Sequence, residues 1–109
     1  MVVGPDYMRG LRTGEEDAVE ALLHAAFPGP QEAGLVRRLR AEGRIEMEIV
    51  LPWQGEIVGY LALSRLLAPQ GWLALAPVAI GPAWQGRRLG ARLVAMTMQL
   101  VKIKQQSVV

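Results

Sequence analysis

Residues 81–91 read GPAWQGRRLGA, a basic loop punctuated by glycines that joins an apolar segment to an amphipathic one. The apolar segment, residues 72–80, has no charged side chain and predicts a buried strand. After the loop, five apolar residues recur every three or four positions and predict a helix that turns them inward: Leu89, Leu93, Met96, Leu100 and Ile103. This junction of strand, loop and helix is the most informative part of the chain.

The junction has the features of an anion-binding site. A helix start offers free backbone N–H groups and the positive end of the helix dipole, which suit a phosphate or diphosphate. Gly86 and Gly90 would let the main chain approach such a ligand without a Cβ, and Arg87 and Arg88 add positive charge. The run is neither a Walker A loop nor a dinucleotide-binding Gly-x-Gly-x-x-Gly. Two interpretations remain open: an anion-binding loop, or a tight turn with surface arginines.

Two helices are predicted after a short strand over residues 6–12. The first begins near Thr13, because the positions that follow are acidic and the helix dipole favours negative charge there: Glu15, Glu16 and Asp17. Its apolar residues recur at helical spacing and form one inward face: Val19, Leu22, Leu23, Ala26 and Phe27. The second helix covers residues 31–41, with Leu35 and Leu39 inward and Arg40 outward.

From Arg44 the apolar pattern changes to a period of two. Ile45, Met47, Ile49 and Leu51 alternate with Arg44, Glu46, Glu48 and Val50, which predicts a strand with one wet face. Gly55 predicts a hairpin turn, and residues 57–63, apolar on both faces, predict a central strand. Another turn is expected at residues 68–71. Pro77 interrupts the strand over residues 72–80, so pairing on one side must be broken or absent there.

Length and composition exclude several classes of protein. The chain has 109 residues, 51% of them hydrophobic, which allows one small ordered domain. With no cysteine and a single histidine, His24, neither a disulfide framework nor a metal site is expected. No apolar run approaches the ~20 residues that a membrane span needs, and no signal peptide is recognisable. We therefore expect a soluble cytoplasmic protein that does not bind membranes.

Charge is distributed unevenly along the chain. Residues 1–76 carry seven arginines and ten acidic residues, whereas residues 77–109 carry five basic residues and no acidic one. The basic segment suggests a polyanion as ligand, and the acidic one a cationic co-substrate; a plain basic surface helix is the alternative. Nucleic acid is not expected as the polyanion, because aromatic residues do not alternate with the basic ones.

Residues 75–93, LAPVAIGPAWQGRRLGARL, resemble motif A of the GNAT superfamily of N-acetyltransferases, which reads Gln/Arg-x-x-Gly-x-Gly/Ala after a Leu-x-Val strand. The order of predicted elements is also similar, so the resemblance covers roughly residues 6–100. It implies an α/β (α+β) fold, a mixed and mostly antiparallel sheet flanked by helices in the order β-α-α-β-β-β-α.

The resemblance also implies acetyl-coenzyme A as co-substrate and a primary amine, in a small molecule or a peptide, as acceptor. The amine attacks the thioester directly, and a backbone N–H of the strand holds the carbonyl oxygen. The diphosphate would lie on the loop amides, and the pantetheine arm would pair with the strand where it splays near Pro77. The implied cofactor-binding residues are Val78, Ala79, Ile80, Gln85, Gly86, Arg87, Arg88, Leu89, Gly90 and Ala91.

The chain departs from the family pattern in two places. Arg88 stands where the family has a glycine, and the family domain continues beyond the motif helix, so the chain is interpreted as truncated there. Residues 1–101 are interpreted as the domain and 102–109 as an atypical polar tail, either an ordinary tail or a foreign junction. The strand over residues 72–80 would then be an uncovered edge, which predicts a homo-oligomer, in the simplest case a dimer.

No catalytic residue can be named from the sequence. Tyr7 and Tyr60 are expected to be core or cleft-wall residues, and His24 a solvated surface residue. Glu46 and Glu48 are expected on the wet face of the hairpin, where they could attract an amine. Two functions remain: an N-acetyltransferase, or a non-catalytic remnant of this fold that binds coenzyme A or acts as a dimeric module.

Overall fold

The computed structural model describes residues 7–66, 71–103 and 107–108. The elements run β1 (Arg9–Gly10), α1 (Glu16–Ala26), α2 (Gln31–Ala41), β2 (Ile45–Trp53), β3 (Glu56–Arg65), β4 (Trp72–Ile80), a 3-10 turn η1 (Pro82–Trp84), α3 (Leu89–Ile103) and β5 (Ser107–Val108). One sheet has the order β1-β2-β3-β4-β5, antiparallel except for the β4–β5 pair. The expected α+β order β-α-α-β-β-β-α is confirmed, with β5 added after α3.

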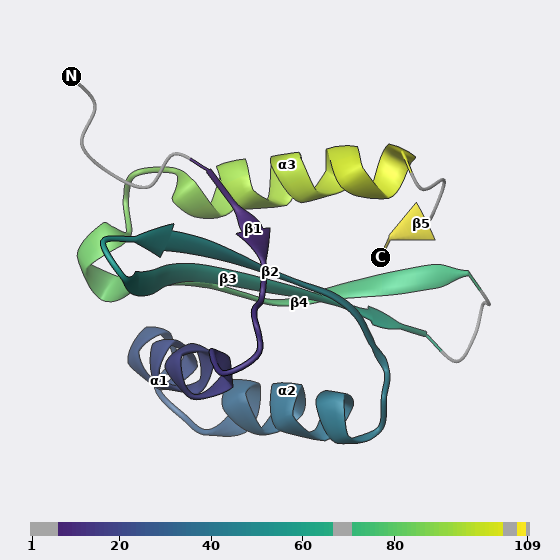
Figure 1. Ribbon diagram of the computed structural model, residues 1–109, viewed down its shortest axis with the longest axis horizontal. Helices are drawn as coiled ribbons and strands as arrows, with labels where there is room; N and C mark the ends of the chain where they lie inside the picture. The colour runs from purple at the N-terminus through teal and green to yellow at the C-terminus, as the bar shows by residue number, and fades with distance from the viewer. Residues whose placement is uncertain (1–6, 67–70, 104–106, 109) are drawn as a thin grey trace.

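Helices cover both faces of the sheet. Figure 1 shows α3 on one face and the pair α1 and α2 on the other. On the α1–α2 face, Val19 and Val36 pack in one core cluster with Val50 and Tyr60 of the sheet. On the α3 face, a second cluster contains the strand residues next to these in sequence, together with one residue of α3: Ile49, Leu61, Leu63 and Leu93. Successive strand residues point to opposite faces, so each helical layer receives every second side chain.

The prediction that β2 has one wet face is wrong. Val50, assigned to that face, is fully buried under α1 and α2. From Met47 on, alternate residues of β2 point to opposite faces, and helices cover both faces. Ile45 was predicted on the same face as Met47, but a register shift lies between them and Ile45 packs on the α1–α2 face. Glu48 lies on the same face as Val50 and is half-buried rather than solvated.

The inward face of α3 is rotated relative to the predicted one. Leu89, Leu93, Thr97 and Val101 are buried at a spacing of four, whereas Met96 and Leu100 are each 37% exposed. The side chain of Ile103 lies outside the described part. A polar residue at the centre of the buried row broke the apolar pattern in the sequence. The Thr97 hydroxyl lies 3.9 Å from the Met8 sulfur, a weak hydrogen bond that gives this buried group a partner.

The N-terminal elements are shorter than predicted. The strand expected over residues 6–12 is limited to Arg9–Gly10, and Asp6 lies outside the described residues. The first helix begins at Glu16 rather than near Thr13, with Glu16 and Asp17 in its first turn as expected. Glu15 instead closes the turn before the helix, because its carboxylate accepts the Arg12 N–H at 2.8 Å.

The second helix has the predicted bounds but a different inward face. Ala33, Val36 and Leu39 are its buried residues, whereas Leu35, which was predicted inward, is only partly buried. Arg40 was predicted to point outward and instead turns toward β2.

The ladder between β3 and β4 is interrupted where the proline predicted it. Leu61 pairs with Val78 and Leu63 with Leu75, so Ala76 and Pro77 together stand opposite one β3 residue and form a bulge. The predicted central position of residues 57–63 and the hairpin at Gly55 are confirmed. The turn expected at residues 68–71 lies outside the described residues apart from Gly71.

Candidate functional site

The end of β4 leads directly into the loop that the sequence analysis identified. The Gly81 N–H donates to the Val58 carbonyl at 2.8 Å, and the Trp84 N–H donates to the Gly81 carbonyl at 2.8 Å, which closes η1. The Gln85 side-chain amide then donates to the Ile80 carbonyl at 3.0 Å. These three bonds fix the entry of the loop, whereas residues 85–88 themselves are exposed.

Two residues of the loop adopt left-handed backbone conformations. Gly86 has φ 83° and Arg88 has φ 59°. Helix α3 begins directly afterwards, and the Arg88 carbonyl accepts the Arg92 N–H at 3.1 Å. The first turn of α3 contains no acidic side chain that would compete for its N–H groups. This helix start therefore has the electrostatic character of an anion site.

An aromatic stack holds one of the loop arginines. The Arg87 guanidinium lies 4.8 Å from the Trp84 ring centroid, and Trp84 meets Trp53 of β2 edge to face with centroids 5.7 Å apart. A guanidinium over an indole ring is attracted by its π-electrons. The sequence analysis missed this stack because Trp53 and Trp84 are distant in sequence and meet only through the packing of β2 against the loop.

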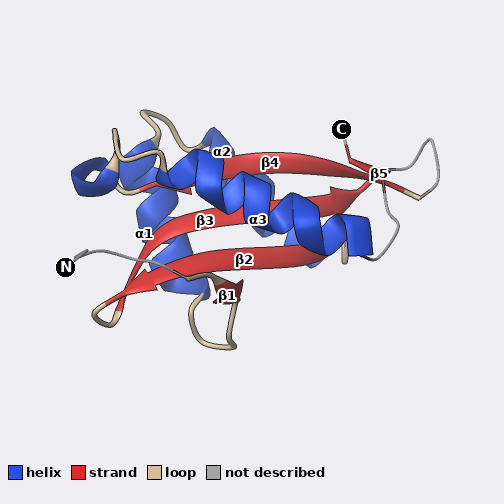
Figure 2. Ribbon diagram, turned by 90° about the horizontal axis from the view of Figure 1, so that it is seen from above, coloured by secondary structure: helices blue, strands red, loops and turns tan. Residues whose placement is uncertain are grey.

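The strand edge and the loop form one continuous surface. Val78, Ala79 and Ile80 pair with β3 on one side. On the other side, β5 pairs only with Trp72 and Leu73, and within residues 7–66, 71–103 and 107–108 no strand pairs with the rest of this edge. Figure 2 shows β5 beside only one end of β4, with the loop leaving from the opposite end. The structure thus brings residues 78–80 together with residues 85–91.

The junction fits the phosphate end of a coenzyme A thioester. A Cβ added to Gly86 would meet no atom within 4 Å, so the main chain there faces open space. A Cβ on Gly90 would lie 3.6 Å from Ile80, an ordinary contact. Arg87, Arg88 and Arg92 are exposed around the loop. An accessible main chain, a helix start and three cations are the groups that hold a diphosphate.

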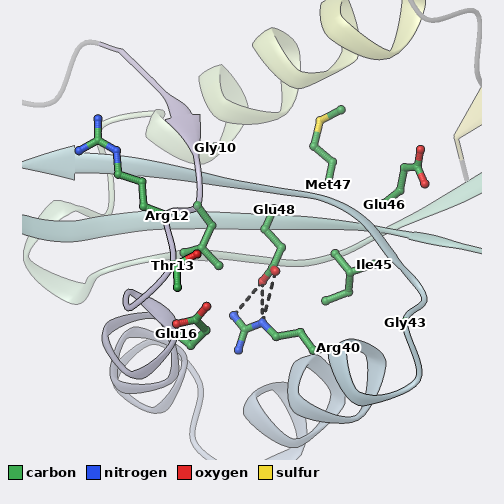
Figure 3. Close-up of a pocket in the computed structure, with 11 residues that line it drawn as sticks. Gly10, Arg12, Thr13, Glu16, Arg40, Gly43, Ile45, Glu46, Met47 and Glu48 are labelled. Carbon is green, nitrogen blue, oxygen red and sulfur yellow. Dashed lines mark hydrogen bonds and ion pairs between the residues drawn. The ribbon is translucent and has the colours of Figure 1, made fainter.

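A cavity of about 400 Å³ lies on the face of the sheet that α1 and α2 cover, between the β1–α1 turn, the end of α2 and β2. Figure 3 shows Arg40 of α2 reaching Glu48 of β2 inside it. Arg40 Nη2 lies 2.7 Å from Glu48 Oε1, and the Tyr60 hydroxyl donates to the same oxygen at 2.6 Å. Burial and the hydrogen bond to Glu48 raise the pKa of Tyr60. Burial opposes charge on Arg40, but the hydrogen bonds and charge of Glu48 outweigh it and raise its pKa.

This network corrects the expected role of the two glutamates. Glu46 is paired with Arg65 at 2.9 Å and Glu48 with Arg40, so both negative charges are compensated. They lie on β2, and β3 separates that strand from β4. The structure therefore does not bring them to residues 78–80.

The tyrosines and the histidine have different environments. Tyr60 is fully buried, as expected for a core residue. Tyr7 is 60% exposed, so the expectation that it is a core residue is wrong, whereas a place in a cleft wall stays a prediction. His24 is exposed, as predicted. None of the three lies on β4 or the loop.

A second cavity, of about 460 Å³, adjoins the loop entry. Its wall consists of one face of α1, the start of β3 and residues 81–84. Three alanines of α1 contribute to it, Ala18, Ala21 and Ala25, so the lining is mostly small and apolar. No sequence pattern indicates this cavity, because these alanines lie outside the buried face of α1.

Among the residues that the structure describes, no three acidic, histidine or cysteine side chains gather as metal ligands would. No described helix combines the length and the apolar character that crossing a bilayer requires.

Comparison with known proteins identifies relatives of this chain. The model of the "Acetyltransferase (GNAT) family" matches residues 16–105. The uncharacterized N-acetyltransferase YhbS of Escherichia coli K12 is 33% identical over 81 residues, which cover 70% of this chain and 48% of YhbS. The chain thus spans about half the length of the curated relatives it matches.

Solved structures agree with this match. A GNAT family acetyltransferase from Brucella melitensis in complex with acetyl-CoA superimposes with a TM-score of 0.86 at 26% identity, covering 92% of this chain and 70% of that one. Escherichia coli YhbS in complex with CoA superimposes with a TM-score of 0.82 at 26% identity, covering 89% of this chain and 56% of that one.

Proposed function

This chain belongs to the GNAT acetyltransferase family, and from that premise we propose that it binds acetyl-coenzyme A at the β4–α3 junction and transfers the acetyl group to a primary amine. The observation that carries the proposal is the junction itself. An open loop and an acid-free helix start continue a strand edge that is paired on one side. The relatives that superimpose on it were solved with acetyl-CoA and with CoA.

Each part of the junction has a distinct task in this proposal. The amides of Gln85 to Ala91 hold the diphosphate, because the first N–H groups of a helix have no intrahelical partner. The main chain of Val78, Ala79 and Ile80 pairs with the amide groups of the pantetheine arm, as an added strand would. The bulge at Ala76 and Pro77 marks where the edge of β4 changes direction.

The chemistry requires a positioned thioester and a neutral amine. The thioester supplies the acetyl group: the amine nitrogen bonds to its carbonyl carbon, the carbon–sulfur bond breaks and coenzyme A leaves as the thiolate. The nitrogen loses one proton and the thiolate takes one up, so the products are an amide and free coenzyme A thiol. A backbone N–H of β4 that holds the carbonyl oxygen would stabilise the negative charge developing there. Residues 72–86 include no carboxylate and no imidazole. This stretch therefore contributes to catalysis by orientation and main-chain hydrogen bonds, not by proton transfer from a side chain.

Calorimetry with acetyl-coenzyme A and coenzyme A tests the binding step. We expect heat of binding and a rise in the unfolding temperature with both ligands. The absence of both signals would overturn the proposal. Release of free thiol in the presence of a panel of small amines and peptides tests the transfer step.

A second candidate is binding of coenzyme A without turnover. The observation that favours it is the state of the acid–base groups in the core. Tyr60 pairs with Ala79 of β4, but its side chain is buried and its hydroxyl donates to Glu48 of β2, so this hydroxyl is already engaged within the core. Binding of acetyl-coenzyme A with no thiol release across the amine panel would support this candidate over the transferase.

A further inference from the structure

We propose that Gln85 is a positioning residue, which fixes the distance between the loop and the outer edge of β4, the edge that faces away from β3. The fixed distance makes the junction selective for the length of the ligand that spans it. The contact concerned is the hydrogen bond that the Gln85 side-chain amide donates to the Ile80 carbonyl at 3.0 Å. This inference rests on the proposed binding of coenzyme A at the β4–α3 junction.

The Ile80 carbonyl lies on the outer edge of β4. The Gly81 N–H donates to the Val58 carbonyl of β3, and a trans peptide directs its C=O and N–H to opposite sides, so the Ile80 carbonyl points away from β3. In an antiparallel ladder the main-chain groups of successive residues turn alternately to one side and to the other. Val78 therefore also turns its main chain to the outer edge, whereas Ala79 turns its main chain to β3.

Gln85 occupies one acceptor of this edge. The loop amides proposed to hold the diphosphate begin at Gln85 itself, so the hydrogen bond joins the first residue of the diphosphate site to the last residue of the edge. No described strand pairs with residues 78–80 on this side. The Ile80 N–H and the main-chain groups of Val78 are thus left for the amide groups of the pantetheine arm.

The side chain of Ile80 gives this contact a fixed base. A Cβ on Gly59 of β3 would lie 3.1 Å from Ile80 Cδ1, and a Cβ on Gly90 of α3 would lie 3.6 Å from Ile80 Cγ1. Ile80 thus packs between two glycines, one on the neighbouring strand and one in the first turn of the helix. It also packs against a buried cluster that includes Leu89. The strand end and the helix start are therefore held together.

The loop between these two points depends on Gln85. Residues 85–88 are exposed, and a Cβ on Gly86 would meet no atom within 4 Å. Among the described residues, the bond from Gln85 is the one side-chain hydrogen bond that residues 85–88 make, and Arg87 contacts the Trp84 ring of the loop itself. Without this bond, the loop amides would have more freedom to move relative to the outer edge.

A fixed spacing makes the junction selective for the length of its ligand. A molecule that binds two subsites at once gains affinity only when its linker matches the distance between them. Coenzyme A presents its diphosphate to the loop and the first amide group of its arm to the outer edge. With the loop held on Ile80, one linker length satisfies both, and the thioester then lies at a defined place along β4.

Calorimetric titration of the full chain with coenzyme A and with a synthetic homologue tests the assignment. The homologue carries one extra methylene between the diphosphate and the first amide group of the arm. We expect the wild type to bind coenzyme A about tenfold more tightly than the homologue, a difference the size of about one hydrogen bond. Gln85→Met keeps the length of the side chain but removes its N–H donor, and it should reduce this ratio to about threefold or less.

Two further variants separate positioning from a general effect. Gln85→Arg should restore most of the ratio, because a guanidinium can also donate to the Ile80 carbonyl. Gln99→Met makes the same change at an exposed position of α3 and should leave the ratio at the wild-type value. The unfolding temperature of Gln85→Met should lie within about 4 °C of the wild type, since the lost hydrogen bond is exposed.

The possible failures are distinguishable. If the wild type binds neither ligand, the proposed function fails and this inference fails with it. If the wild type binds both ligands equally, the inference is overturned while the proposed function stands. If Gln85→Met weakens both ligands by the same factor, Gln85 supports binding without setting the spacing, and the inference is again overturned.

Discussion

The Tyr60 hydroxyl donates a hydrogen bond to Glu48 Oε1 at 2.6 Å, across the ladder between β3 and β2. The same carboxylate receives the Arg40 guanidinium, so one oxygen joins two strands and α2. The side chain of Glu48 is 14% exposed and that of Arg40 is 24% exposed. A charge placed this far from water is tolerated because its hydrogen bonds are satisfied within the protein.

We predict that this network stabilises the fold. Tyr60→Phe should lower the free energy of unfolding by about 1–2 kcal/mol, since it leaves a buried acceptor with one partner fewer. Glu48→Ala should lower it by about 3 kcal/mol, because Arg40 then lacks its counter-charge. Urea unfolding measures both. Glu46→Gln, whose partner Arg65 is half-exposed, is the matched control and should change it by less than about 1 kcal/mol. Equal losses for Glu48→Ala and Glu46→Gln would contradict the prediction.

The ion pair before α1 predicts an acid-dependent stability. Hydrogen bonds from Arg9 and from the Arg12 N–H lower the pKa of Glu15 to about 2 from an ordinary value of 4.5. Because the folded-state pKa is depressed, this stabilisation is present above the ordinary value and is lost as the pH falls toward 2. Unfolding temperatures measured across this range should therefore fall less steeply in Glu15→Gln than in the wild type. Parallel curves for the two proteins would show that Glu15 does not contribute.

Trp84 positions Arg87 in this structure and should therefore affect ligand affinity. Trp84→Leu keeps an apolar side chain but removes the ring, so Arg87 loses its 4.8 Å contact. We expect coenzyme A affinity to fall by about threefold, the size of an exposed cation–π interaction. Trp84→Phe retains a ring and should lose less. Calorimetric titration distinguishes them, and unchanged affinity in Trp84→Leu would show that the stack is not needed.

The sequence predicted the fold well because its strongest signals are local. Residues 31–41 and 72–80 have the bounds that their patterns indicated, and Gly55 turns the hairpin as its conformational freedom suggested. The errors arose where tertiary packing decides. Thr97 is buried because a sulfur from the N-terminal segment lies beside it, and no local pattern contains that contact.

The candidate site was predicted in part for the same reason. Its main-chain component, residues 85–91, depends on local order of strand, loop and helix and was recognisable. Its side-chain component depends on residues distant in sequence. Trp53 of β2 contacts Trp84 of the loop. Glu48 lies away from the site because β3 stands between β2 and β4 in the sheet. The spacing of residues along the chain predicts neither the contact of Trp53 with the loop nor the distance of Glu48 from it.

The exposed side of α3 leads to the last prediction, which concerns assembly. Met96 and Leu100 are each 37% exposed and lie one turn apart, so they form an apolar strip on the helix surface. Such an exposed apolar strip favours association with a second copy. We expect a homodimer in light scattering and a shift toward monomer in Leu100→Glu. Gln99→Glu adds the same charge at a neighbouring exposed position and should leave the dimer intact. A wild-type monomer at every concentration would exclude this contact, because burial of the strip then would not outweigh the loss of translational freedom.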